Sequence, residues 1–167
     1  RLVADAEASV AVGRGGRLHP LPGMRTHPLL APDSQLLAIA QEKLTNIATH
    51  TAFLWPCPGA DGEDGYVRVT ALACRPQAPD YFTCLVMISP PGDLYGLTRR
   101  ELEVLGLLID GRANQDIAGK LFITQRTVAA HLEHIRAKLD VPTRTVAAVR
   151  SLHQALYLPA QLANLAA

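Results

Sequence analysis

Two histidines, His131 and His134, are three residues apart, a spacing that can place two imidazoles on one metal ion. A metal site of this kind needs further ligands, and no cysteine or aspartate lies obviously near the pair in the sequence. The cysteines Cys57, Cys74 and Cys84 are widely spaced and odd in number, so they indicate free thiols and neither a disulfide framework nor a metal cluster. We therefore expect no metal site and no cofactor.

Two other stretches have compositions that could bind ions. Residues 13–17, Gly-Arg-Gly-Gly-Arg, could suggest a phosphate loop, but Pro20 and Pro22 follow where a helix would be needed, so a turn is expected. The acidic run at residues 61–65 lacks the oxygen-ligand spacing and final glutamate of a calcium-binding EF-hand, which favours a solvated turn. The chain also has no nucleophile elbow or other positioned catalytic set, and we expect it not to be an enzyme.

The stretch from Leu97 to Leu158 predicts four short amphipathic helices. Their boundaries follow from residues that start or stop helices: the capping box Thr98/Glu101, the stop Asp110-Gly111, the caps Asn114 and Thr124, and the break Val141-Pro142-Thr143. Short helices joined by two to four residues are typical of helix-turn-helix domains.

The third of these helices has one apolar stripe and one face of small and polar residues. The stripe is Val128, Leu132, Ile135 and Leu139, the opposite face Arg126, Ala130, Glu133 and Ala137, one flank Thr127, His131, His134 and Lys138, and the other Ala129 and Arg136. Small outward residues let a helix approach another surface, such as the major groove of DNA, and the polar flank suits phosphate oxygens. The competing interpretation is a solvated helix face.

This stretch resembles the C-terminal DNA-binding domain of LuxR/FixJ-type transcriptional regulators over about 60 of the 167 residues. The matching residues are Leu97, Thr98, Arg100, Glu101, Glu103, Val104, Leu105, Gly111, Asn114, Ile117, Ala118, Leu121, Ile123, Thr127, Val128, His131, Ile135, Lys138, Leu139, Val141 and Arg144. The resemblance implies a four-helix module whose third helix enters the major groove and whose fourth often forms a dimer contact.

Ten residues are predicted to contact DNA: Thr124, Gln125, Arg126, Thr127, Ala129, Ala130, His131, Glu133, His134 and Lys138. The resemblance implies phosphate contacts for the residues at 124, 127, 131 and 138 and base contacts for those at 129, 130 and 133. Several relatives have a long polar residue where this chain has Ala129 and Glu133, so Gln125 and Arg126 are alternative base readers. Glu101 and Arg144 are expected to pair within the domain.

Charge is distributed unevenly between the two halves of the chain. Residues 97–157 contain nine Lys or Arg against six Asp or Glu, a net charge of +3, whereas residues 1–96 contain seven against nine, a net charge of −2. This asymmetry fits DNA contact by the C-terminal half alone. Apolar runs fall short of the ~18 residues that span a membrane, and no signal peptide is visible, so a soluble cytoplasmic protein is expected.

The N-terminal half predicts one helix and a late antiparallel hairpin. Residues 35 to about 50 predict a helix that belongs either to a domain core or to a dimer contact, with residues 41–43 on its polar face. Residues 66–74 and 81–88 alternate as strands around a loop at 75–80, and residues 10–12 suggest one short strand. This order loosely resembles the closing part of a PAS- or GAF-type sensor, although the stretch looks too short and strand-poor for a complete one.

Taken together, these patterns predict an α+β protein with a sensor-like or partial regulatory domain at 1–93. A four-helix DNA-binding domain follows at 94–167, with the helix-turn-helix proper at 114–133. The expected function is sequence-specific binding of double-stranded DNA as a transcriptional regulator. A homodimer is expected, with Val146, Val149, His153 and Leu156 offering a stripe for self-association or for closing the core. The alternative is a protein-interaction or small-molecule sensor module that no longer binds DNA; an unidentified ligand at the N-terminal part is compatible with both.

Overall fold

The computed structural model describes residues 5–45, 49–57, 65–74 and 82–164. The chain divides into two compact units, Arg1–Pro91 and Gly92–Ala167, hereafter the N-terminal and C-terminal units. No helix among the described residues is long and apolar enough to cross a membrane.

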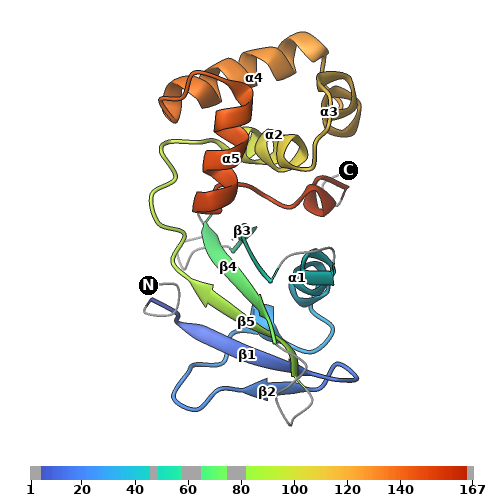
Figure 1. Ribbon diagram of the computed structural model, residues 1–167, viewed down its shortest axis with the longest axis vertical. Helices are drawn as coiled ribbons and strands as arrows, with labels where there is room; N and C mark the ends of the chain where they lie inside the picture. Colours follow the sequence, from blue (N-terminus) through green and yellow to red (C-terminus); the bar gives the residue numbers. More distant parts are fainter. Residues whose placement is uncertain (1–4, 46–48, 58–64, 75–81, 165–167) are drawn as a thin grey trace. The chain divides into compact units, whose positions relative to one another are not determined.

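The N-terminal unit contains a five-stranded antiparallel sheet with the order β2-β1-β5-β4-β3 (Figure 1). The strands are β1 (Ala8–Gly13), β2 (Leu18–Pro20), β3 (His50–Pro56), β4 (Tyr66–Ala73) and β5 (Phe82–Ser89). The first and last strands pair at the centre of the sheet, where Val10 faces Val86. Closing the sheet therefore requires a contact between segments more than 70 residues apart in the chain.

Helix α1 (Gln35–Thr45) lies across one face of the sheet, and the core of this unit lies between them. The short 3-10 helix η1 (Pro28–Leu30) precedes α1. Alternate strand residues point toward this face, and Val10, Val86 and Ala71 are at most 3% exposed. Leu36 and Ala40 of the helix are fully buried. A shift of one residue would turn these apolar strand side chains away from α1, which explains why the register is well specified.

Several expectations for this half are confirmed and others are wrong. The two predicted strands of the hairpin pair as β4 and β5, and the glycine-arginine run forms the turn between β1 and β2. The helix does not continue to His50, because His50 begins β3. The prediction that this half is poor in strands is wrong, because β2 and β3 complete the sheet. Both strands contain a proline, and neither was predicted from the sequence. The acidic residues 61–64 and the predicted loop 75–80 lie outside the described residues.

The C-terminal unit contains the four predicted helices, α2 (Arg99–Ile109), α3 (Asn114–Leu121), α4 (Gln125–Lys138) and α5 (Arg144–Gln154), followed by the 3-10 helix η2 (Ala160–Asn164). The capping box is present, because the hydroxyl of Thr98 accepts from the N–H of Glu101 and the Glu101 carboxylate accepts from the N–H of Thr98. Gly111, with φ of +76°, ends α2 as expected.

After α5 the chain turns back onto α2. The N–H of Leu158 donates to the carbonyl oxygen of Leu102 at 3.2 Å, and Leu156, Tyr157 and Leu158 are at most 2% exposed. A Cβ added to Gly106 would lie 1.9 Å from the carbonyl oxygen of Leu158. The two segments therefore approach so closely that only glycine fits at position 106.

Candidate nucleic-acid interface

Helix α3, a three-residue turn and helix α4 form the predicted helix-turn-helix. Phe122 ends α3 in the left-handed conformation, with φ of +53°, and its side chain is 82% exposed. Thr124 then caps α4, its hydroxyl oxygen accepting from the N–H of Thr127 at 3.1 Å. The predicted cap at Asn114 is wrong: Ala113 holds the cap position of α3 without a side-chain hydrogen bond, and Asn114 is the first helical residue.

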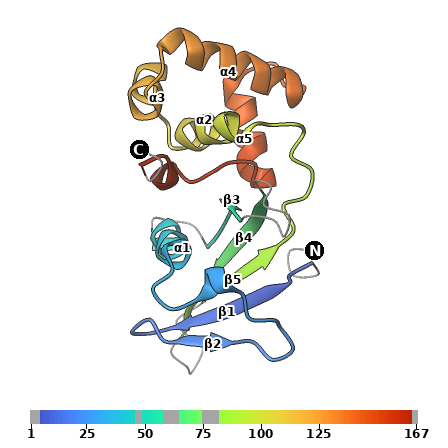
Figure 2. The same ribbon diagram turned by 180° about the vertical axis from the view of Figure 1, so that it is seen from behind.

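One face of α4 is buried as the sequence predicts. Val128 and Ile135 are fully buried, Leu139 is 1% exposed and Leu132 is 7% exposed. These side chains hold α4 against the other helices of the unit, and both views show α2 and α5 on the same side of α4 (Figures 1 and 2). The described residues of this unit leave the other side of α4 free.

The free face of α4 carries most of the predicted contact residues. Gln125, Arg126, Ala129, Ala130, Glu133, His134 and Lys138 are exposed, whereas Thr127 and His131 are half-buried. The first turn of α4 contains no acidic residue, so the positive end of its helix dipole is not neutralised there. An exposed helix start of this kind favours contact with phosphate oxygens.

Lys138 has intramolecular partners in addition to its predicted role. Its ammonium group donates to Glu101 Oε2 at 2.7 Å and to the carbonyl oxygen of Gly96 at 2.8 Å. The same carboxylate oxygen accepts from the N–H of Thr98. Lys138 therefore ties the last turn of α4 to the capping box of α2, and its contact with phosphate stays a prediction.

Burial and hydrogen bonding act in opposite directions on Glu101. Burial raises the pKa of this carboxyl, because its side chain is only 3% exposed. The hydrogen bond and charge of Lys138, together with the hydrogen bonds from Thr98, outweigh burial and leave the pKa below its ordinary value. Glu101 is therefore held as a carboxylate.

The expected pair between Glu101 and Arg144 is wrong. Arg144 instead donates to Asn114 Oδ1 at 3.1 Å and to the carbonyl oxygen of Arg112 at 3.3 Å, which links the start of α5 to the start of α3. Both arrangements use an arginine or lysine that lies far from its partner in the chain. Because no local spacing marks such a pair, the sequence offered no signal to choose between Lys138 and Arg144 as the partner of Glu101.

The profile described as "Bacterial regulatory proteins, luxR family" matches residues 96–151, which include α2, α3, α4 and most of α5. Residues 96–151 form a LuxR-family helix-turn-helix domain. This finding confirms the resemblance on which the expected third-helix recognition depends. The α+β fold class is also confirmed, with the sheet in the N-terminal unit and the helical domain in the C-terminal unit.

Several curated relatives are transcriptional regulatory proteins by name. The chain is 53% identical over 53 residues to the transcriptional regulatory protein LiaR of Bacillus subtilis, covering 32% of this chain and 25% of LiaR. It is 48% identical over 65 residues to LnrK of the same organism, covering 39% of this chain and 30% of LnrK. The oxygen regulatory protein NreC of Staphylococcus haemolyticus is 50% identical over 48 residues, covering 29% of this chain and 22% of NreC. The chain thus spans less than a third of the length of these relatives.

Solved structures of VqmA show a weak likeness over a larger part of the chain. The structure described as VqmA bound to DPO has a TM-score of 0.39 and 20% identity, covering 78% of this chain and 64% of that chain. A Vibrio cholerae VqmA dimer solved in the absence of target DNA has a TM-score of 0.38 and 19% identity, covering 78% and 66%. These values are too low to establish a shared fold or ligand.

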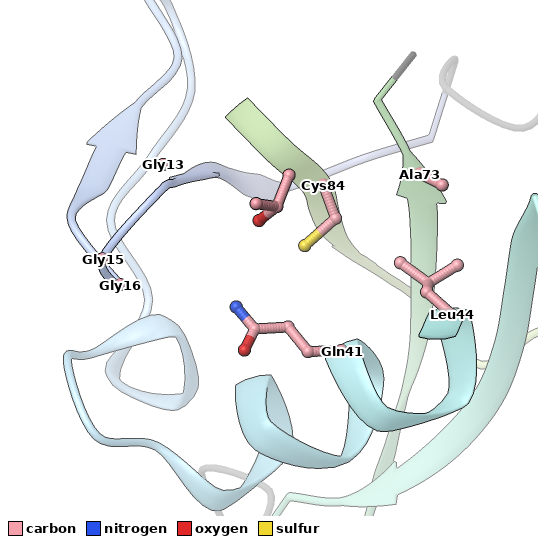
Figure 3. Close-up of a pocket in the computed structure, with 8 residues that line it drawn as sticks. Gly13, Gly15, Gly16, Gln41, Leu44, Ala73 and Cys84 are labelled. Carbon is pink, nitrogen blue, oxygen red and sulfur yellow. The ribbon is translucent and has the colours of Figure 1, made fainter. Parts of the chain in front are cut away.

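Two features of the candidate sites were not predicted from the sequence. Leu152 joins Val146 and Val149 as an exposed apolar residue on α5, whereas the predicted fourth member of the stripe, Leu156, lies beyond the helix and is fully buried. Gln41, assigned to a polar helix face, lines a cavity in the N-terminal unit (Figure 3). The spacing of Leu152 from Val149 could have indicated the first feature. The second depends on how α1 packs against the sheet, which no local pattern in the sequence indicates.

Proposed function

We propose that this chain is a sequence-specific DNA-binding transcriptional regulator that inserts α4 into the major groove. The observation that carries the proposal is the free face of α4 within a LuxR-family helix-turn-helix domain. Exposed Ala129 and Ala130 allow close approach to base edges, and Ala130 suits a thymine methyl group. Gln125 and Arg126 have the hydrogen-bonding groups that read purines, and Glu133 can accept from a cytosine amino group.

The proposal is tested by selection from a random DNA pool with the purified chain at two salt concentrations. We expect a recovered motif and a steep loss of affinity as salt rises, because phosphate contacts release counterions. Retention of no DNA at low salt, or retention without a motif, contradicts sequence-specific binding by the chain. Either outcome would favour the alternative function, a protein-interaction module that no longer binds DNA.

Substitutions on α4 should separate base contacts from phosphate contacts. Gln125→Ala is expected to relax the preferred base at one position of each half-site, at a cost of about 1–3 kcal/mol for the preferred sequence. Thr127→Val is expected to weaken binding to all sequences by a similar factor, because phosphates carry no sequence information. Repeating the selection with each variant, and with Gln35→Ala in α1 as a matched control, measures both effects. An unchanged motif for Gln125→Ala contradicts its role as a base reader.

We further propose a homodimer that forms through α5. Val146, Val149 and Leu152 are 42%, 50% and 46% exposed and lie at intervals of three residues on one side of that helix. A second copy of the same stripe would bury these side chains and place two α4 helices on two half-sites. The N-terminal unit is the proposed regulatory part of the chain.

Val149→Glu is expected to convert the dimer to a monomer, because it places a charge in the buried centre of the contact. Sedimentation velocity measures the mass of each variant at one concentration. The comparison variant is Ala38→Glu, on the exposed side of α1. A dimer that survives Val149→Glu but dissociates with Ala38→Glu would instead assign the contact to α1.

A further inference from the structure

The N-terminal unit contains a cavity of about 500 Å³ at the edge of the sheet that β2 forms. Residues of β1, of β2 and of the segment 25–32, which joins β2 to α1, line it. A backbone bridge between Ala8 and Arg25 holds this segment beside β1. The cavity shares no described lining residue with the one beside Gln41, and its volume lies within the range of sites that hold small organic molecules.

Most of the described residues that line this cavity are apolar. Val10, Leu18 and Leu30 contribute aliphatic side chains, and Val10 and Leu30 are buried. Three prolines complete the apolar lining: Pro20, Pro28 and Pro32. Because the ring of a proline fixes the φ angle of its residue, these positions keep the shape of the cavity when it is empty.

Three consecutive residues, 25–27, bring hydrogen-bond donors to the same cavity. Among the described residues, neither the exposed guanidinium of Arg25 nor the hydroxyl of Thr26 has a hydrogen-bond or ion-pair partner. The Nδ1 atom of His27 accepts from the N–H of Leu29 at 3.2 Å, so the ring proton lies on Nε2. This nitrogen is therefore a donor as well.

The charge of Arg25 is not balanced by its neighbours in the chain. Residues 8–32 contain three arginines and no Asp or Glu, a net charge of +3, whereas residues 1–96 have a net charge of −2. Asp33 follows this stretch but is not among the described residues that line the cavity. An arginine stays protonated at any pH at which proteins are folded, so an unpaired guanidinium beside apolar surface favours an anion.

We infer that this cavity binds a small monocarboxylate that has an apolar body. The guanidinium of Arg25 can donate two parallel hydrogen bonds to the two oxygens of a carboxylate. The Thr26 hydroxyl and the Nε2–H of His27 can donate to the remaining lone pairs of these oxygens. The aliphatic and proline side chains would cover the body of the ligand and remove it from water.

Hexanoate is a suitable probe, with hexanamide and hexylammonium as neutral and cationic molecules of similar size. Titration of the whole chain, followed by its amide NMR signals, is expected to show saturable binding of hexanoate. Hexanamide is expected to bind about tenfold more weakly, because it cannot form the charge-assisted hydrogen bonds, and hexylammonium more weakly still. Equal binding of all three, or no saturable binding of hexanoate, would overturn the inference.

Two substitutions that each remove one positive charge separate the cavity from general attraction to a basic surface. Arg25→Gln should weaken hexanoate binding about tenfold and abolish the preference for hexanoate over hexanamide. The matched control is Arg17→Gln, since Arg17 is exposed in the same basic stretch but is not among the described lining residues. It should change hexanoate binding by less than about twofold, because salt screens a distant charge. Equal losses in the two variants would contradict the assigned site.

Ala31→Trp tests the apolar part of the cavity. Ala31 lines the cavity and is exposed, so a larger side chain can occupy the space without displacing the core. Provided that circular dichroism and thermal unfolding show a folded variant, it should bind neither hexanoate nor hexanamide, and hexanoate binding that persists would contradict the inference. The inference goes beyond the proposed DNA-binding function, and the two fail separately. DNA selection without hexanoate tests α4, whereas hexanoate titration without DNA tests the cavity.

Discussion

Alanine at position 106 is expected to destabilise the C-terminal unit by about 3 kcal/mol or more. The added Cβ would lie 1.9 Å from the carbonyl oxygen of Leu158 and 3.1 Å from its carbonyl carbon. Both atoms belong to the backbone, so the clash cannot be relieved by rotating a side chain. Relief requires movement of the segment after α5, whose side chains at 156–158 are buried. The gain of about 1 kcal/mol in helix propensity does not offset this loss.

Gly119 provides a matched control because it also lies within a helix, α3. A Cβ at this position meets nothing within 4 Å, so Gly119→Ala should stabilise the unit by about 0.5–1 kcal/mol. Urea denaturation followed by circular dichroism at 222 nm measures the free energy of unfolding of both variants. Similar effects of the two substitutions would mean that the chain after α5 does not approach α2 as closely as described.

Lys138→Met is expected to lower the free energy of unfolding of the same unit by about 2–3 kcal/mol. Methionine keeps most of the apolar stem but removes the charge that pairs with Glu101, whose side chain is only 3% exposed. The carboxylate would then lack its strongest partner in a place with little access to water. Arg136→Met on the same helix is the control, since Arg136 is exposed, and it should change stability by no more than about 0.5 kcal/mol.

The double variant Glu101→Gln/Lys138→Met should recover part of this loss, because a neutral amide costs less to bury than an unpaired carboxylate. The pair should also respond to pH. Because the pKa of Glu101 is lower in the folded protein than its ordinary value of 4.5, the stabilisation is present above that pH. It should be lost as the pH falls below 4.5 through the folded-state pKa, and Glu101→Gln should lack this part of the pH dependence. A pH profile shared by the parent protein and Glu101→Gln would rule out the assigned pair.

These effects also bear on how variants of Lys138 are interpreted. Uniformly weaker DNA binding is the result expected from a lost phosphate contact. The same result would follow from partial unfolding of the domain when its tie to Glu101 is removed. Stability must therefore be measured beside affinity for every Lys138 variant, whereas Gln125 and Thr127 do not hold one helix to another.

The helical half could be predicted in detail because its signals are local. A capping box, a glycine stop and an apolar stripe each act within a few residues, and the structure places Thr98, Gly111 and Val128 accordingly. The exception, Asn114, has a residue type typical of caps, but its oxygen accepts from Arg144 across the unit. Local preference identified a helix start there and missed its position by one residue.

The sheet was harder to predict because its information is not local. β2 has three residues and ends in proline, so it does not resemble an ordinary strand in isolation. β3 does contain the strand formers Thr51, Phe53 and Trp55, so its local pattern could have indicated a strand but not its partner. Their place in the sheet depends on the pairing of β1 with β5 and of β3 with β4. The cavity beside Gln41 was not foreseeable for the same reason, since Gln41 and Cys84 approach one another only after the sheet has formed. The pair of Glu101 with Lys138 likewise joins residues 37 positions apart.

The segment that follows α5 determines where this helix-turn-helix domain can be cut or fused. The family match ends at residue 151, yet Ala155, Leu156, Tyr157 and Leu158 are each no more than 2% exposed. Burial of a side chain as large as leucine contributes about 1.5–3 kcal/mol, so a fragment trimmed at the family boundary would lose much of its interior. A segment transferred to another regulator should therefore extend past Leu158. A linker to a different domain should begin after that residue.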